Sequence, residues 1–364
     1  MQKTIRWGIL GTGGIAQDFV QGVQVVPDAV IGAVGSRTQA KADSFAQQFG
    51  IAKAYSSYEA LVNDPDLDVI YIGTPNHIHK ENCLLALGAG KAVLCEKPFA
   101  MNAAEAREVV AFAREKKLFC MEAMWMRFMP IMPKLRSMLA DGVIGDICML
   151  LADFGGRPPF DPSNRFYNAE MGGGAMLDLG VYPLSLAYFL LGQPSQIVSQ
   201  AIIGKTGVDE QVVTILKYPA GNQAVVTTSF LSTFPTDALI VGSKGQIRIQ
   251  NPMYAPRQLV LTMFGGDHHS SGAARSGLVA AAKQNRYIRA AYSRSKGLIK
   301  RFLPTDGKSI TVPVTGNGYN YEAIEVMNCL RASQIESKIM PLDETIQIME
   351  ALDTIRQQWQ SEGA

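Results

Sequence analysis

Glu96 and Lys97, followed by Pro98, are the first residues in this sequence whose types and spacing could do chemistry. They come directly after an apolar run, residues 92–95, which predicts a short buried strand. In open α/β sheets, ligands and catalytic groups lie at the carboxyl ends of the strands. We therefore expect this ammonium and this carboxylate to line a site, with a surface salt bridge as the alternative.

A carboxylate and a phenol form the second candidate group. Asp178 and Tyr182 follow three glycines at residues 172–174, in a stretch that predicts a helix. A spacing of four places both side chains on one helical face, where they could contact a polar substrate. The alternative is a hydrogen bond between the two that anchors the helix.

A glycine-rich turn near the start of the sequence indicates a dinucleotide site. The strand expected at residues 5–10 is followed by Gly11, Thr12, Gly13, Gly14, Ile15 and Ala16. This is the pattern G-x-G-x-x-A, in which the glycines allow a tight turn and a close approach of pyrophosphate to the next helix.

The end of the second expected strand, residues 30–34, favours NADP over NAD. An NAD-binding protein usually has a carboxylate near this point to hold the ribose 2′-hydroxyl. Here the strand is followed by Ser36 and Arg37, with Lys41 one helical turn further on. A hydroxyl and two cations suit a 2′-phosphate. Alternatively, Arg37 stacks on adenine, which would serve either cofactor.

A third strand end carries polar residues within reach of a nicotinamide ribose. Thr74, Pro75 and Asn76 follow the apolar run of residues 68–73, and His79 comes one turn later. These are turn residues at the carboxyl end of a strand. The histidine could instead be a helix-start residue with no ligand. Residues 103–116 predict an amphipathic helix.

Taken in order, these motifs resemble the glucose-fructose oxidoreductase / inositol dehydrogenase / rhizopine-catabolism family. The resemblance rests on G-x-G-x-x-A, Ser-Arg, Thr-Pro-Asn-x-x-His and Glu-Lys-Pro, and covers the first domain. It implies that Lys97 is catalytic beside the nicotinamide and that Glu96 also faces the cofactor. It further implies catalytic roles for Asp178 and Tyr182, and it places Arg165 near the cofactor or substrate.

The segment Trp125-Met126-Arg127-Phe128 is similar to one branch of that family, the dimeric dihydrodiol dehydrogenases and NADP-dependent D-xylose dehydrogenases. That similarity implies that Trp125 and Arg127 lie near the cofactor at the domain junction.

The elements that must position these residues indicate an α/β protein of two parts. Residues 1–123 predict a Rossmann domain with a doubly wound parallel sheet. Residues 124–340 predict an α+β domain, whose period-two pattern at residues 196–250 indicates an open, mostly antiparallel sheet. Residues 341–364 predict a helix near the domain junction. The family resemblance implies that the sheet pairs with a second subunit, as a homodimer or higher oligomer.

Composition is that of a soluble globular protein. The 364 residues carry 34 basic and 32 acidic side chains, so the net charge of +2 offers no case for nucleic-acid or membrane binding. The region of residues 265–308 is the exception, being rich in arginine and lysine; we expect a solvated insertion, or less readily a patch for an anionic partner.

The cysteines predict a reducing compartment. They are odd in number and scattered, mostly within apolar runs, so we expect reduced core thiols and no metal site. No leader sequence and no apolar stretch long enough for a bilayer are visible, so we expect a cytoplasmic protein. The cysteines are Cys83, Cys95, Cys120, Cys148 and Cys329.

These observations predict an NADP-dependent oxidoreductase that transfers a hydride between the nicotinamide and a sugar C1 hydroxyl or a related vicinal diol. One alternative is a transhydrogenating sugar oxidoreductase that keeps its cofactor tightly bound. Another is a non-catalytic regulator that senses NADP, which the presence of Lys97, Asp178 and Tyr182 disfavours.

Overall fold

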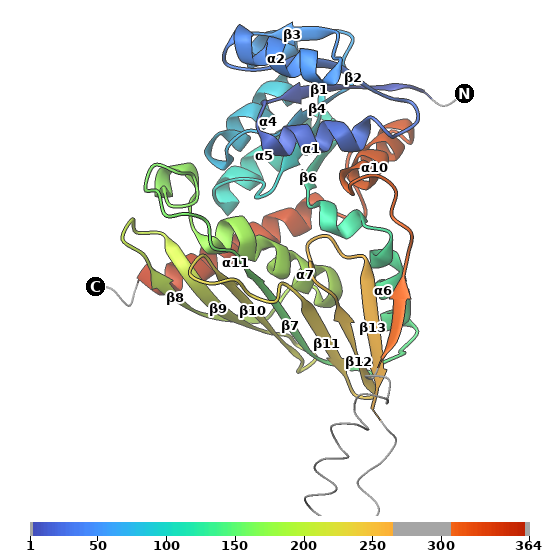
Figure 1. The fold of residues 1–364 in the computed structure, drawn as a ribbon, viewed down its shortest axis with the longest axis vertical. Helices are drawn as coiled ribbons and strands as arrows, with labels where there is room; N and C mark the ends of the chain where they lie inside the picture. Colours follow the sequence, from blue (N-terminus) through green and yellow to red (C-terminus); the bar gives the residue numbers. More distant parts are fainter. Residues whose placement is uncertain (1–2, 265–306, 361–364) are drawn as a thin grey trace, which may run out of the picture.

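The computed structural model describes residues 3–264 and 307–360. These residues form two sheets, one above the other in the view of Figure 1, with helices between them. The basic region predicted at residues 265–308 lies almost entirely outside the described residues.

The first sheet is a six-stranded parallel sheet with the doubly wound order of a Rossmann fold, as predicted. Its strands are short and almost wholly apolar because helices cover both faces. In spatial order they are β3 (Lys53–Tyr55), β2 (Ala29–Gly35), β1 (Ile5–Leu10), β4 (Val69–Ile72), β5 (Ala92–Glu96) and β6 (Cys120–Ala123). The helical segments are α1 (Gly14–Val23), α2 (Gln39–Phe49), α3 (Tyr58–Val62), η1 (Asn76–Ile78), α4 (His79–Gly88) and α5 (Ala103–Lys116).

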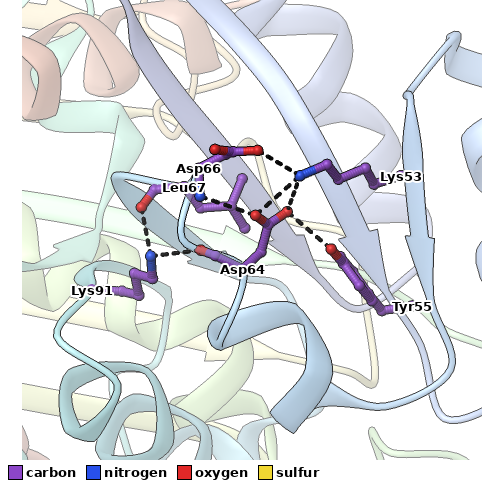
Figure 2. Close-up of polar contacts among 6 residues, drawn as sticks. All are labelled: Lys53, Tyr55, Asp64, Asp66, Leu67 and Lys91. Carbon is purple, nitrogen blue, oxygen red and sulfur yellow. Dashed lines mark hydrogen bonds and ion pairs between the residues drawn. The ribbon is translucent and has the colours of Figure 1, made fainter.

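A buried carboxylate fixes the turn that leads into β4 (Figure 2). Asp64 accepts hydrogen bonds from Lys53, from the Tyr55 hydroxyl and from the backbone N–H of Asp66. Burial acts to raise the pKa of Asp64, but these hydrogen bonds outweigh it and lower the pKa. Below them, Lys91 donates to the Asp64 carbonyl at 2.7 Å, so the turn is held from both sides.

The second sheet has eight strands and is mostly antiparallel; β7 and β10 are its one parallel pair among the described residues. It is wider than the range 196–250 expected from sequence, because β7, β13 and β14 join it. The strand order is β14 (Lys308–Thr311), β13 (Gln258–Met263), β12 (Gly245–Ile249), β11 (Ala238–Gly242), β7 (Ile147–Gly155), β10 (Gln223–Ser229), β9 (Asp209–Lys217) and β8 (Gln196–Ile203).

Among the described residues, helices cover the face of this sheet that is turned toward the first sheet (Figure 1). One of them, α7, is buried from Val181 to Tyr188. On the other face alternate side chains are exposed, among them Val198, Ile202, Val213 and Ile215. The helical segments of this part are η2 (Trp125–Phe128), α6 (Ile131–Ala140), η3 (Ala169–Met171), η4 (Met176–Gly180), α7 (Val181–Leu191), α10 (Tyr319–Arg331) and α11 (Leu342–Gln360).

The C-terminal helix α11 contacts both parts of the protein. Its Asp353 accepts a hydrogen bond from the backbone N–H of Ala103 at the start of α5, and Glu350 forms an ion pair with Arg107. At its other end Gln358 accepts from the backbone N–H of Ser199 on β8. The helix therefore links the first sheet to the edge of the second.

Two expectations from composition need correction. Cys148 is exposed, whereas the other four cysteines are buried free thiols. The segment Ala169–Leu191 is long and apolar enough to cross a bilayer, contrary to the sequence reading. Most of that segment is buried inside the protein, as in the core helix of a globular fold.

Candidate active site

A long cavity of about 830 Å³ runs along the carboxyl ends of the first sheet. The glycine turn after β1, the polar residues after β2 and the turn after β4 all contribute to it, because parallel strands end at the same edge. Of the residues predicted to bind a cofactor, it is lined by Gly11, Thr12, Gly13, Ser36, Arg37, Lys41, Thr74 and Pro75.

The glycine turn fits a pyrophosphate. Gly11 has φ +106°, and a Cβ there would lie 2.8 Å from the Gly73 carbonyl oxygen, so only glycine is accommodated. A Cβ on Gly13 or Gly14 would meet nothing within 4 Å, so there is open space above the turn. No side chain caps the start of α1, which leaves its first backbone N–H groups available to an anion.

The outer end of this cavity is cationic. Ser36 Oγ lies 3.5 Å from Thr12 Oγ, and Arg37 and Lys41 line the same space. No aspartate or glutamate is among the described residues that line it. Gln17, Ser44 and Tyr58 also line it, and sequence reasoning did not identify them.

A second cavity of about 440 Å³ joins the glycine turn to the candidate catalytic residues. It brings together residues that are far apart in the sequence, from the segments that follow β1 and β4, from the end of β5, from the segment before η3 and from α7. Its lining includes Gly13, Gly14, Ile15, Thr74, Pro75, Asn76, Glu96, Lys97, Arg165 and Tyr182.

Lys97 is the centre of a charged group at the junction of the two sheets. Its Nζ donates to the Asp178 carbonyl at 3.0 Å and lies 3.6 Å from the Asp178 carboxylate. It also lies over the ring of Tyr182, 4.8 Å from the ring centroid. Arg165 donates to the Asp178 carboxylate at 2.9 Å. The three candidate catalytic side chains and Arg165 thus meet in one place.

The pKa shifts in this group follow from burial and the neighbouring charges. Burial acts to lower the pKa of Lys97, but Tyr182, Asp178 and Glu96 outweigh it, and the pKa is raised. Burial acts to raise the pKa of Asp178, but Lys97 and Arg165 outweigh it, and the pKa is lowered. Both groups are therefore charged at neutral pH, which disfavours Lys97 as a neutral base.

Tyr182 is held as a neutral phenol. Burial raises the pKa of Tyr182 to about 12, although Lys97 acts to lower it. The Trp125 indole Nε1 donates to the Tyr182 oxygen at 3.1 Å. Because an indole N–H can only donate, the phenol proton points elsewhere.

The sequence predicted that Asp178 and Tyr182 lie on one regular α-helix. The structure differs. Asp178 is within a π-helical turn, Met176–Gly180, and Tyr182 is in the first turn of α7. The Asp178 carboxylate bonds to Arg165, and no hydrogen bond joins it to Tyr182 among the described residues. Turns of this kind are frequent at functional sites.

A third cavity, of about 420 Å³, opens on Lys97, Asp178 and Tyr182 from the side of the second sheet. Aromatic rings make up much of its wall, and sequence reasoning identified only two of them. They come from separate elements, so no local motif could have indicated them. The rings belong to Trp125, Phe154, Phe166, Tyr182, Phe230, Tyr254 and Tyr319.

Glu96 lines the second cavity, and its buried carboxylate accepts from the Tyr71 hydroxyl at 2.7 Å. Two other residues predicted to contact a cofactor, Trp125 and His79, line neither cofactor cavity. Trp125 lines the aromatic cavity rather than the cofactor cavities. His79 is fully buried, with its ring nitrogens 2.8 Å from the carbonyl oxygens of Thr74 and Pro98, so it supports the two turns instead of touching a ligand.

Arg127, predicted to lie near the cofactor at the domain junction, lines neither cofactor cavity among the described residues. Its side chain has no exposed surface, so a ligand cannot reach it. It donates to the hydroxyl and carbonyl of Ser185 on α7 and forms an ion pair with Glu344 on α11. A buried charge needs such partners, and burial lowers the pKa of Arg127 despite them. Among the described residues, no group of three or more side chains could hold a metal ion.

Comparison with known families agrees with this geometry. The family model described as "Oxidoreductase family, NAD-binding Rossmann fold" matches residues 5–124. The model of the GFO/IDH/MocA C-terminal domain matches residues 132–248. The fold and the site together define an oxidoreductase that uses a nicotinamide dinucleotide. The chain belongs to the GFO/IDH/MocA family, which confirms the resemblance seen in its motifs.

Relatives of known activity cover nearly the whole chain. The mouse trans-1,2-dihydrobenzene-1,2-diol dehydrogenase is 38% identical over 97% of this chain and 96% of its own length. The human enzyme of the same name is 36% identical over the same shares.

Solved structures show the same fold at lower sequence identity. KijD10, a 3-ketoreductase from Actinomadura kijaniata in complex with NADP and TDP-benzene, matches with a TM-score of 0.79 at 23% identity, over 98% of each chain. Levoglucosan dehydrogenase in complex with NADH and levoglucosan matches with a TM-score of 0.80 at 19% identity, over 98% of this chain and 97% of that one.

Proposed function

We propose that this protein is an NADP-dependent dehydrogenase of vicinal diols or of the C1 hydroxyl of sugars. The observation that carries the proposal is the meeting of Lys97, Asp178 and Tyr182 where the cofactor cavities join the aromatic cavity. The cofactor, when bound, supplies or accepts the hydride. The protein's own residues must orient the substrate and move the hydroxyl proton.

Tyr182 is our choice for the proton transfer. In the direction of carbonyl reduction, the neutral phenol of Tyr182 donates its proton to the substrate oxygen. That proton is available because Trp125 donates to the phenol oxygen and does not accept from it. In the direction of oxidation, the phenol must first ionise, and the Lys97 ammonium beside the ring favours the phenolate.

Lys97 and Asp178 then have separate roles. The raised pKa of Lys97 keeps an ammonium that can donate to the substrate oxygen. Asp178 holds this ammonium in place through its carbonyl and balances the charge of Lys97 and Arg165. Arg165 lines both the cofactor and the aromatic cavities, so it can contact either ligand.

The aromatic cavity favours a ring-shaped substrate with adjacent hydroxyls. Its flat apolar walls suit the carbon face of a sugar or cyclic diol, whereas the charged groups at one end suit the hydroxyls. This agrees with the activity named for the mouse and human relatives.

NADP is favoured by the cationic outer end of the cofactor cavity. Ser36, Arg37 and Lys41 line it, and no described carboxylate there would repel a 2′-phosphate. The fold alone does not decide between the two cofactors, because KijD10 was solved with NADP and levoglucosan dehydrogenase with NADH.

The proposal is tested with a panel of aldoses, inositols and trans-dihydrodiols, each assayed with NADP and with NAD for formation of the reduced nicotinamide. We expect turnover of at least one diol or aldose, loss of kcat on the order of 10²-fold or more in Lys97→Met, and no loss in Lys338→Met, which changes an exposed lysine. Tight cofactor binding without turnover of any class would overturn the proposal.

A further inference from the structure

A row of aromatic rings leads outward from the candidate active site. Phe166 and Phe230 both line the aromatic cavity, with ring centroids 5.7 Å apart in an edge-to-face arrangement. Tyr167 lies 5.6 Å from Phe230, and Phe160 lies 4.9 Å from Tyr167. The row therefore continues past the wall of the cavity toward the protein surface.

The outer end of this row borders another cavity, of about 480 Å³. It shares Arg157, Pro158 and Phe230 with the aromatic cavity, so the two spaces adjoin at these residues. The catalytic side chains do not line it. The reaction as described above therefore gives this space no role.

The walls of the outer cavity are mainly apolar and partly exposed. Phe160 is 54% exposed and Leu231 is 43% exposed, which is unusual for side chains of this size beside a cavity. Tyr167 is held in place by a hydrogen bond from its hydroxyl to the Pro158 carbonyl at 3.0 Å. Arg157, Lys205 and Glu210 are the charged residues of the lining, two cations and one anion.

We propose that the outer cavity is a second substrate subsite, which binds the apolar, ring-bearing part of an extended diol whose hydroxyls react at Tyr182. The proposal rests on the proposed function for the reacting end. Continuity with the aromatic cavity identifies the occupant as part of the same molecule. The edge-to-face rings offer stacking surfaces to a planar group, and the exposed Phe160 and Leu231 gain burial when it binds.

The test compares a one-ring and a three-ring substrate, trans-1,2-dihydrobenzene-1,2-diol and trans-1,2-dihydrophenanthrene-1,2-diol. We expect kcat/KM to be higher for the three-ring diol. Phe160→Ala, which removes a ring from the outer cavity only, should lower kcat/KM for that diol about tenfold and change it less than about twofold for the one-ring diol, because only the larger molecule reaches Phe160. Leu231→Ala should act in the same direction.

Phe264→Ala is the matched control, because Phe264 is 46% exposed and lies outside both cavities. Calorimetric binding of the three-ring diol, with cofactor present, gives a second readout that does not need turnover. Tighter binding of this diol than of the one-ring diol, lost in Phe160→Ala, supports the subsite even if neither diol reacts; absence of turnover then counts against the proposed function alone.

Three results would overturn the subsite. The first is an equal loss for both diols in Phe160→Ala, and the second is no preference for the larger diol in the unmodified protein. The third is a change of oligomeric state in Phe160→Ala without a change in the ratio of the two kcat/KM values, which would mean that a second copy of the chain covers the cavity.

Discussion

The indole nitrogen of Trp125 lies 3.1 Å from the phenol oxygen of Tyr182, although the two residues come from separate elements. Tyr319 stacks on the Trp125 ring with centroids 4.5 Å apart, which fixes the direction of the indole N–H. The Tyr182 oxygen therefore already accepts one hydrogen bond before a substrate binds. That bond favours the ionised phenol over the neutral one.

Trp125→Phe should slow the oxidation of alcohols more than the reduction of carbonyls. Loss of the donated hydrogen bond raises the pKa of Tyr182, so less phenolate forms at a given pH. We expect kcat for oxidation to fall about tenfold, in keeping with the loss of one hydrogen bond to a charged group. The measurement is kcat against pH in both directions; an unchanged profile would show that the bond has no part in the reaction.

Tyr182→Phe and Lys97→Met separate the proton-transfer group from its neighbour. If Tyr182 transfers the proton with Lys97 holding the substrate oxygen, each variant should lose on the order of 10²-fold or more in kcat. Near-normal kcat in Tyr182→Phe, with only KM raised, would instead assign proton transfer to Lys97.

Glu96 should make both activity and stability depend on pH near neutrality. Burial raises the pKa of Glu96 from 4.5 to about 7, although hydrogen bonding from Tyr71 and the charge of Lys97 act to lower it. The carboxylate that supports the Lys97 ammonium is therefore lost as the pH falls below about 7. We expect a fall of kcat/KM there, absent from Glu96→Gln.

The stability of the protein should depend on the ionisation of Glu96 in the opposite direction to its activity, because stability should fall as the pH rises. Because the pKa of Glu96 is higher in the folded state, folding favours the protonated carboxyl group. Its contribution to the free energy of unfolding is therefore complete below pH 4.5 and is lost as the pH rises through about 7. Thermal unfolding between these pH values should show Tm falling with pH in the unmodified protein more than in Glu96→Gln. Parallel Tm curves for the two proteins would contradict this.

Replacing Ser36 by Asp and Arg37 by Leu should reverse the cofactor preference. Each of the two original side chains should contribute roughly 1.5–3 kcal/mol to binding of the 2′-phosphate. The new carboxylate can accept from a ribose 2′-hydroxyl and repels the phosphate. The ratio of kcat/KM for NADP to that for NAD measures the change. Equal or better use of NAD by the unmodified protein would show that the cofactor was assigned wrongly.

We propose that the exposed face of the second sheet forms a homodimer. Val198 and Ile215 are directly paired across β8 and β9 and are 47% and 41% exposed. Ile215→Lys should give a monomer in light scattering at micromolar concentration, because a charge would be buried at the interface. Val30→Lys, at an exposed valine of the first sheet, is the control. A monomeric unmodified protein would contradict the proposal.

Local sequence predicted the elements and residues whose structure depends on near neighbours. The helix expected at residues 103–116 has these bounds because Asn102 caps its start and Lys117 ends it in the left-handed conformation. The glycine turn and the position of Lys97 after β5 follow equally from short motifs.

Residues whose roles depend on distant partners could not be predicted. The sequence predicted that Arg127 is a site residue. In the structure its side chain lies in the core, where it contacts Ser185 and Glu344. Phe154, Tyr254 and Tyr319 belong to no motif in the sequence, and only the fold brings their rings around one cavity. The π-turn at Asp178 has no sequence pattern that distinguishes it from an α-helix.

The linkage made by α11 has a consequence for the order in which the protein is completed during synthesis. The residues of the first sheet leave the ribosome well before Asp353, which accepts a hydrogen bond from the start of α5, and Gln358, which binds the edge strand β8. Domains usually fold as units from the N-terminus while the chain is being made. Here α5 of the first domain and β8 of the second sheet lack some of their hydrogen-bond partners until α11 has been made. Ribosome-bound chains that end before residue 340 should therefore be cut by protease at the start of α5, and chains that include α11 should resist.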